Sequence, residues 1–248
     1  MKKETVIEIT NLSKSFGDLE VLKGISLNLY KGENLVVLGK SGSGKSVLIK
    51  CIVRLLEADG GRIQILGEDI NILNINMLGE LRKKIGFLFQ SGALYDSMTV
   101  RQNLEFPLRR IKRDLNQKER DAVVSEVLEN VGLAEVIDKM PSQLSGGMRK
   151  RISLARTLVA DPLIMLYDEP TTGLDPVTSE EISALINTVQ EKYKTSSIII
   201  THDIECARAT ADRIIMLQDG GLFMEGRLEE FEHSTDPSIQ SFFKTYTK

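Results

Sequence analysis

Apolar and polar residues follow two different patterns along this chain. Four short runs are almost entirely apolar, which is typical of parallel strands buried on both faces. They lie at 35–38, 85–89, 163–167 and 197–200. Nearer the N-terminus, a run at 6–9 is followed by 21–29, whose second half is apolar at every other position. These two runs predict strands of a half-buried antiparallel sheet.

Further strands are predicted on both sides of the buried runs. A pair of glycines breaks the chain before an apolar segment at 62–67. Near the C-terminus, the segments 213–217 and 222–225 flank a glycine-containing turn, which predicts a β-hairpin. The chain is therefore predicted to be α/β, with a mostly parallel core sheet and an N-terminal antiparallel β subdomain.

The segment 91–140 has helical periodicity and no strand pattern. Two capping boxes mark helix starts within it. They are Thr99 with Gln102, and Asn116 with Glu119. We expect a helical subdomain inserted into an α/β core that consists of 1–90 and 141–226. The residues after the core, 227–248, are expected to form a helical tail.

A glycine- and serine-rich loop joins the buried run 35–38 to an apolar helix pattern. It reads Gly39, Lys40, Ser41, Gly42, Ser43, Gly44, Lys45 and Ser46, followed by Val47. Glycine, four residues and Gly-Lys-Ser is the spacing of a P-loop, and this motif requires a strand before it and a helix after it. The backbone N–H groups and the helix N-terminus then form an anion site. We expect Lys45 to reach the β- and γ-phosphates of a nucleotide and Ser46 to bind Mg²⁺.

Polar residues follow three other buried runs, at the edge where open α/β sheets place their ligands. In chain order these residues are Gln90, the pair Asp168 and Glu169, and His202. Asp168 is a candidate ligand of the metal ion, and Glu169 is a candidate for the base that activates water for attack on the γ-phosphate. Gln90 is a candidate for contacting Mg²⁺ or that water, and otherwise a solvated loop residue. His202 is a candidate for bonding the γ-phosphate, and otherwise a structural histidine.

A second helix N-terminus has the character of an anion site. Ser145, Gly146 and Gly147 precede a helix pattern, and they combine a capping hydroxyl with free backbone N–H groups. Because one P-loop already accounts for one triphosphate, this second site predicts a further ligand or a nucleotide held by another copy of the chain. Asp175 is placed to cap the helix after the Asp168–Glu169 strand.

Composition narrows the function classes. The 248 residues carry 32 lysines and arginines against 35 aspartates and glutamates, a formal charge of −3, so no nucleic-acid partner is expected. No apolar run approaches the ~20 residues that span a bilayer, and the start lacks the apolar core of a signal peptide. We expect a cytoplasmic protein, or one peripheral to the membrane on that side. Cys51 and Cys206 lack metal-site spacing and are expected to be buried.

Four features have no assigned role from these patterns. Phe16 either stacks on an adenine ring or lies in the core. The apolar loop 93–98 has no evident core to join and is a candidate partner surface. The basic run 109–113 is a solvated face or a surface turned toward anionic lipid. Apolar residues at helical spacing in the tail 227–248 dock on their own domain or on another subunit.

The combination of these motifs, in this order and over essentially the whole chain, resembles the ATPase subunit of ABC transporters. The motifs that carry the resemblance are the P-loop, Gln90, 144–151, Asp168 with Glu169, 173–175 and His202. The resemblance implies a P-loop NTPase fold of ABC type with ATP and Mg²⁺ as cofactors. It also implies a head-to-tail homodimer that encloses two ATP molecules between its subunits.

The same resemblance implies a role for each motif. Phe16 matches the aromatic residue that stacks on adenine, and Gln90 the residue that links the metal site to a membrane subunit. Glu169 matches the catalytic base, and His202 the switch histidine. Ser145, Gly146 and Gly147 match the signature that binds the γ-phosphate of ATP held by the other monomer, and Asp175 belongs to the loop that accompanies the site.

Within this family, Met148 stands where the commonest signature has glutamine, so nucleotide contacts there must differ in detail. The segments 148–151 and 89–100 resemble the ATPase of MCE (Mla-type) phospholipid transporters of diderm bacteria. That resemblance implies a subunit on the cytoplasmic face of the inner membrane. It implies a permease contacted through Gln90–Met98 and the helical subdomain, and an MCE-type lipid-binding protein in the same complex.

Two other functions compete with phospholipid transport. One is the ATPase of an importer for a polar solute such as an amino acid, which only the identity of the membrane partner would distinguish. The other is a soluble regulatory ATPase acting on DNA or ribosomes. The chain has one ATPase domain and no long coiled-coil or zinc-hook insertion, which weighs against the regulatory function.

Overall fold

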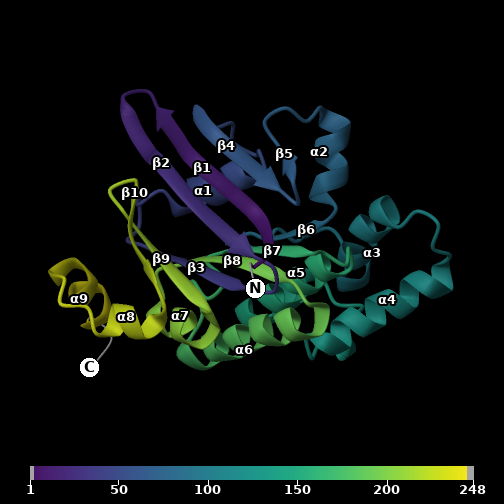
Figure 1. Ribbon diagram of the computed structural model, residues 1–248. Coiled ribbons are helices and arrows are strands. Elements are labelled where there is room, and N and C mark those ends of the chain that lie inside the picture. Colours follow the sequence, from purple (N-terminus) through teal and green to yellow (C-terminus); the bar gives the residue numbers. More distant parts are fainter. Residues whose placement is uncertain (1–2, 245–248) are drawn as a thin grey trace.

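Two sheets organise the chain in the computed structural model, which describes residues 3–244 (Figure 1). The first is antiparallel, with the strand order β2-β1-β4-β5. Its strands are β1 (Thr5–Phe16), β2 (Leu19–Tyr30), β4 (Gly60–Ile65) and β5 (Glu68–Asp69). The second has the order β10-β9-β3-β8-β7-β6 and is parallel except for the hairpin partner β10. Its strands are β3 (Asn34–Leu38), β6 (Ile85–Leu88), β7 (Ile164–Asp168), β8 (Ser196–Thr201), β9 (Arg213–Gln218) and β10 (Gly221–Gly226).

The continuous apolar runs do form the centre of the parallel sheet. Strands β3, β7 and β8 are buried at every residue. Alternate residues of β3 serve two cores: Leu35 and Val37 face the antiparallel sheet, while Val36 and Leu38 face the helices on the other side. The α/β fold with an N-terminal antiparallel subdomain is therefore confirmed. Because β6, β7, β8 and β3 are neighbours and parallel, their carboxyl ends lie along one edge.

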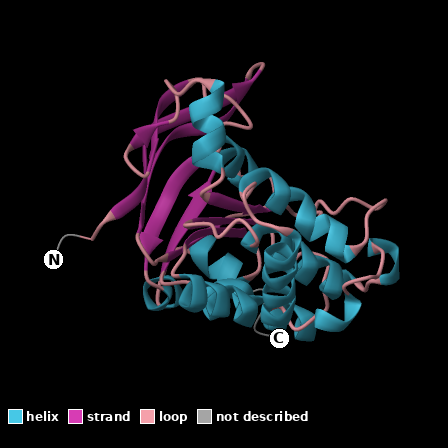
Figure 2. Cartoon of the chain, turned by 90° about the vertical axis from the view of Figure 1, so that its right-hand side faces the viewer, coloured by secondary structure: helices cyan, strands magenta, loops and turns pink. Residues whose placement is uncertain are grey.

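Helices cover the parallel sheet unequally. They are α1 (Lys45–Ile52), α2 (Ile75–Arg82), α3 (Val100–Ile111), α4 (Gln117–Asn130), α5 (Gly146–Leu158), α6 (Pro176–Tyr193), α7 (Ile204–Thr210), α8 (Leu228–Glu232) and α9 (Pro237–Lys244), with 3₁₀ turns at Ala134–Val136 and Pro141–Gln143. Helix α1 lies between the two sheets, and most of the others gather on the far side of the parallel sheet (Figure 2). Among residues 3–244, no helix combines the length and apolar character needed to cross a bilayer.

Helices α3 and α4 occupy the segment 91–140, in which the described structure contains no strand. Both predicted capping boxes are present: the Thr99 side chain accepts from the N–H of Gln102, and Asn116 accepts from Glu119. Buried residues of α3 and α4 join the same core as α5, so the inserted helices are packed against the parallel-sheet unit rather than separate from it.

The described part of the tail docks on its own domain. Phe231, Ile239, Phe242 and Phe243 are at most 8% exposed and belong to the core that also contains α7 and β9. Their burial within one chain decides between the two docking arrangements that the sequence leaves open. The predicted tail extends to 248, and residues 1–2 and 245–248 lie outside the described residues.

Both cysteines are buried, as expected. Cys51 lies on α1 and Cys206 on α7, and each is 1% exposed. Burial raises the pKa of each thiol to about 11. Because the thiolate is the reactive form, both side chains act as small apolar groups of the core.

Candidate functional site

The P-loop turns tightly between β3 and α1, and its glycines are required there. Gly44, the N-cap of α1, has a φ of 96°, and a Cβ on it would lie 2.9 Å from the Val21 carbonyl oxygen. A Cβ on Gly39 would lie 2.5 Å from the Ser43 Oγ. That Oγ is buried and has no hydrogen-bond partner. A glycine cradle with an unsatisfied hydroxyl at a helix N-terminus fits a phosphate group.

Lys45 is the first residue of α1, and it points back across the loop. Its Nζ donates to the carbonyls of Gly39 and Lys40 at 2.7 and 3.1 Å. It also lies 3.6 Å from the Glu169 Oε1, and the residue is 5% exposed. Burial lowers the pKa of Lys45, while the charges of Glu169 and Asp168 act in the opposite direction. A cation is thus held where the phosphates of a nucleotide are expected.

Ser46 and Asp168 meet beside this lysine. The Ser46 Oγ donates to the Asp168 Oδ1 at 3.0 Å. Residues 3–244 contain no group of three or more His, Cys, Asp or Glu side chains that could hold a metal. Such a sparse donor set fits Mg²⁺, which is commonly bound by one or two carboxylates together with substrate phosphates and water. Ser46, Asp168 and Gln90 are the residues that could hold it.

The Glu169 carboxylate lies between the side chains of Lys45 and His202. Its Oε2 accepts from the His202 Nδ1 at 2.8 Å and from the Thr172 Oγ1 at 3.1 Å, and its Oε1 faces Lys45. Glu169 has a φ of 50°, which is uncommon for a residue with a side chain. At 7% exposure, the glutamate has its orientation set by these contacts rather than by solvent.

A cavity of about 510 Å³ collects most of the predicted residues. It is lined by Phe16, Val21, Ser41, Gly42, Gly44, Lys45, Ser46, Val47, Gln90, Glu169 and His202. Phe16 is 48% exposed, so the alternative that it lies in the core is wrong. The phenyl ring, the P-loop and the acid–histidine pair, which are far apart in the sequence, thus border one space large enough for a small ligand.

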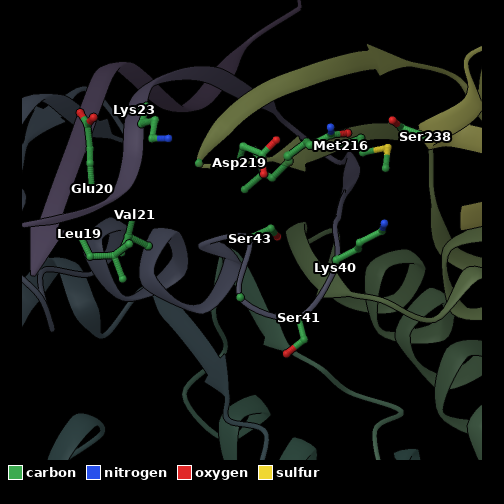
Figure 3. A pocket seen from close by; sticks show the side chains of 14 residues that line it. Leu19, Glu20, Val21, Lys23, Lys40, Ser41, Ser43, Met216, Asp219 and Ser238 are labelled. Atoms are coloured by element: carbon green, nitrogen blue, oxygen red, sulfur yellow. The ribbon is translucent and has the colours of Figure 1, made fainter.

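A second cavity, of about 450 Å³, also borders the P-loop (Figure 3). Lys40, Ser41 and Ser43 border it, opposite Asp219 in the turn between β9 and β10. Val21, Ser41 and Gly42 line both cavities, so the two cavities adjoin at these residues.

The second anion site lies outside both cavities. Ser145 caps α5, and its Oγ accepts from the N–H of Met148 at 3.2 Å. A Cβ on Gly147 would lie 2.5 Å from the Thr178 Cγ2, so α5 approaches α6 closely there. Asp175 caps α6, as predicted, by accepting from the N–H of Thr178 at 3.1 Å. Within one chain, Ser145, Gly146, Gly147 and Asp175 are therefore separate from the cavity that holds Lys45 and Glu169.

Two residues at the site were not predicted from the sequence. Thr172 bonds the Glu169 carboxylate, and Lys150 on α5 donates its Nζ to the main-chain carbonyl of Gln90 at 2.6 Å. Burial lowers the pKa of Lys150, against the raising effect of Asp168 and Glu169. The sequence contains one indication of the role of Lys150: this lysine is in register with Leu154 and Leu158, on the apolar face of α5.

The loop 93–98 packs on the protein more closely than expected. Leu94 is half-buried against the helical core, so the expectation that this loop has no core to join is wrong for that residue. Tyr95 is 42% exposed, and its ring lies edge-on to Phe106 and beneath the Arg156 guanidinium. The nearby run 109–113 is at the surface, where Arg109 pairs with Glu105 at 2.5 Å.

Comparisons with known proteins agree with this geometry. A family model described as "ABC transporter" matches residues 22–172. The chain is 40% identical to the probable ribonucleotide transport ATP-binding protein of Mycobacterium leprae, over 98% of this chain and 70% of that relative. The chain belongs to the ABC transporter family. It is accordingly an ATP-binding ATPase subunit, as the motifs predict.

Other members of the family are similar over the same region. The chain is 36% identical to the methionine import ATP-binding protein of Brucella abortus, over 98% of this chain and 65% of that relative. The chain thus spans about two thirds of the length of these curated relatives. Their names refer to ribonucleotide transport and to methionine import, and not to phospholipid.

Solved structures of ABC proteins share the fold. A dimeric ATP-binding cassette bound to ADP and Pi in a post-hydrolysis state has a TM-score of 0.82 and 35% identity, covering 90% of this chain and 98% of that one. A subunit of an ABC transporter complex from Clostridium perfringens has a TM-score of 0.85 and 28% identity, covering 98% of this chain and 100% of its own. The predicted ABC-type P-loop NTPase fold is confirmed.

Proposed function

We propose that this chain hydrolyses ATP in the cavity beside its P-loop and thereby drives a membrane permease. The observation that carries the proposal is the Glu169 carboxylate held between Lys45 and His202, next to a phosphate-binding loop. In this site the P-loop amides and Lys45 bind the phosphates, and Phe16 stacks on the adenine. Ser46, Asp168 and Gln90 would hold Mg²⁺, which when bound would neutralise phosphate charge.

Glu169 acts as the general base of the proposed reaction. Its carboxylate takes a proton from the attacking water, and the bonds from His202 and Thr172 keep Oε2 fixed while this happens. His202 is 48% exposed at its side chain, so its ring can also reach a phosphate in the cavity. The buried ammonium group of Lys45 stabilises the negative charge of the phosphates.

The active form is proposed to be a head-to-tail homodimer. Ser145, Gly146 and Gly147 form an anion site that their own chain leaves away from the P-loop cavity, which supports binding to a nucleotide held by the partner. The dimeric state of a cassette that is 35% identical to this chain supports the same arrangement. ATP binding would then close the dimer and hydrolysis would reopen it.

The permease is proposed to dock on Gln90–Met98 and the helical subdomain, at the cytoplasmic face of the inner membrane. Asn103 gives this loop a defined shape, because its side chain bonds the N–H of Tyr95 and the carbonyls of Tyr95 and Met98. Tyr95 lies five residues after Gln90 in this loop, and its aromatic ring is exposed. A permease held there would respond to changes around Gln90.

Charge at Tyr95 is expected to uncouple the ATPase from its membrane partner. Tyr95→Glu should abolish co-purification of the permease and its stimulation of ATP turnover, because a carboxylate would replace an aromatic contact. Tyr95 is a sharper test than Leu94, since Leu94 also packs on the core. Leu163→Glu is the control: Leu163 is 53% exposed and precedes β7, at the sheet edge opposite the site. Normal co-purification with Tyr95→Glu would contradict the docking proposal.

Phospholipid is the proposed cargo. The proposal is supported by the resemblance of 89–100 and 148–151 to the ATPase of MCE-type transporters, which also implies an MCE-type lipid-binding partner. Import of a polar solute is the second candidate, favoured by the relatives named for methionine import and ribonucleotide transport. Neither depends on residues of the ATP site, because cargo is selected by other subunits.

The complex itself distinguishes these cargoes. Tagged full-length protein is purified from detergent-solubilised membranes, and bound proteins and lipids are identified by mass spectrometry. A permease with an MCE-domain protein and bound phospholipid is the expected result. A permease with a solute-binding protein would assign polar-solute import. Recovery without any membrane protein would remove the transport proposal and favour the soluble regulatory ATPase, for which nucleic-acid binding by filter assay is the next test.

A further inference from the structure

Lys150 is a buried lysine beside the ATP site that the proposed reaction does not use. It lies on α5 and is 6% exposed. Its Nζ donates to two main-chain carbonyls, that of Gln90 at 2.6 Å and that of Glu169 at 3.3 Å. Because burial of an amine is costly, an apolar residue at this position of the helix would pack at lower cost. The lysine is therefore explained by the two carbonyls that it joins.

The first carbonyl belongs to the loop where we place the permease. Helix α5 holds this loop at three successive places on one face. Lys150 bonds the carbonyl of Gln90, and the Arg156 Nη1 bonds that of Ala93 at 2.6 Å. Between them, Gly92 lies so close to α5 that a Cβ on it would be 2.6 Å from the Ser153 Oγ. A displacement of this loop would therefore be transmitted to α5, and Lys150 is one of the side chains that would transmit it.

The second carbonyl belongs to the residue proposed as the base. The φ of 50° at Glu169 is disfavoured for a residue with a Cβ, and such a conformation persists only where its surroundings hold it. The N–H of Glu169 donates to the Ile200 carbonyl at 2.9 Å, and its carbonyl accepts from Lys150. Lys150 and β8 thus hold opposite sides of the Glu169 backbone, from which the carboxylate projects toward Lys45 and His202.

We propose that Lys150 is a positioning residue through which the loop 90–93 sets the direction of the Glu169 carboxylate. This inference rests on the proposed function, because it takes Glu169 as the base and the loop as the permease contact. Movement of the loop would shift the Gln90 carbonyl, and the shared ammonium would pass that shift to the Glu169 main chain. The ATPase would then be fastest when the permease holds the loop in one position.

Lys150→Met tests the role, because it keeps the length and helix propensity of the side chain and removes its donors. In the assembled complex, we expect kcat for ATP to fall about 10- to 100-fold, since a small misplacement of a catalytic group has effects of this size. The KM for ATP should stay within about threefold, because the P-loop is untouched. Lys150→Gln, which retains N–H donors, is expected to recover most of the turnover.

Ile152→Val is the matched control. Ile152 is fully buried two residues further along α5, and its truncation loosens the same helix without touching either carbonyl. It should lower Tm and leave kcat within about twofold of wild type. Hydrogen exchange gives a second readout: protection of 90–93 and 168–172 should fall in Lys150→Met and not in Ile152→Val. If the methionine variant does not fold, Lys150→Leu serves as the donor-free variant.

Three results would overturn the inference. The first is an unchanged kcat in Lys150→Met. The second is a rise in the KM of Lys150→Met without a fall in its kcat. The third is a fall in kcat in Ile152→Val as large as that in Lys150→Met. The proposed function is tested separately by substitution of Glu169. If Glu169→Gln is slow while Lys150→Met is normal, only the positioning role fails. If Glu169→Gln has normal turnover, the assignment of the base fails instead.

Discussion

Glu169→Gln is expected to bind ATP normally and to lose about 10²–10⁴-fold in turnover, the range for removal of a general base. The amide keeps the size of the side chain, and it can still accept a hydrogen bond from His202 or Thr172 through its oxygen. It cannot take a proton from water at neutral pH. The site would therefore assemble around ATP and stop before hydrolysis. Nucleotide binding and phosphate release are measured on the same preparation.

The control for this substitution removes the same charge elsewhere. Glu191→Gln changes an exposed glutamate near the end of α6, away from the residues that line the ATP cavity. Its turnover should equal that of the wild type. Turnover in Glu169→Gln equal to that of the wild type, measured within the assembled complex, would refute the assignment of Glu169 as base, and attention would move to His202, whose ring bonds the Glu169 carboxylate.

Lys45→Met is expected to lose measurable ATP binding and to lower turnover at least about 10²-fold, as removal of a preorganised charge donor does. The buried ammonium is held by the Gly39 and Lys40 carbonyls and lies beside Glu169. Its removal leaves the phosphates without this cation and leaves the Glu169 Oε1 facing an apolar thioether. Binding is measured by titration with ATP and Mg²⁺, and turnover by phosphate release.

Lys50→Met is the matched control for this second substitution. Lys50 lies on the same helix, five residues along, is only half-buried, and lines neither cavity beside the P-loop. Its loss changes the charge of α1 by the same amount as the loss of Lys45. Because Lys50 lines neither cavity, the affinity for ATP should remain within about twofold of that of the wild type. Unchanged ATP affinity in Lys45→Met would contradict the role of Lys45 on the phosphates.

Much of the fold and the site could be predicted from local patterns. The strand before Gly39, the helix after Lys45 and the acids after β7 are each specified by a few neighbouring residues. Capping boxes at Thr99 and Asn116 likewise depend only on residues three positions apart. These features were predicted correctly because backbone sterics, strand burial and helix capping act over short stretches of chain.

Contacts between distant segments were predicted less well. Phe16 could not be assigned to core or cavity, because one aromatic residue in a loop has no periodicity to place it. Leu94 was expected to be without a core, and it packs against the helical core. No role for Lys150 follows from the sequence, since its partners are main-chain carbonyls 60 and 19 residues away that no sequence motif encodes.

The sequence by itself determined the phosphate-binding loop and the strand ends that carry the acids, because these follow from residue type and short-range spacing. The order of its motifs along the chain also carried the resemblance to ABC transporter ATPases, and the comparisons with known proteins then showed that the chain belongs to that family. Only the tertiary structure decided that Glu169 lies between Lys45 and His202, and that Ser145–Gly147 stands apart from the cavity. It also decided that the tail, as far as residue 244, packs on its own domain. Parallel strand order and the packing of helices on a shared core set these distances, and both arise from burial of apolar surface between segments far apart in the chain.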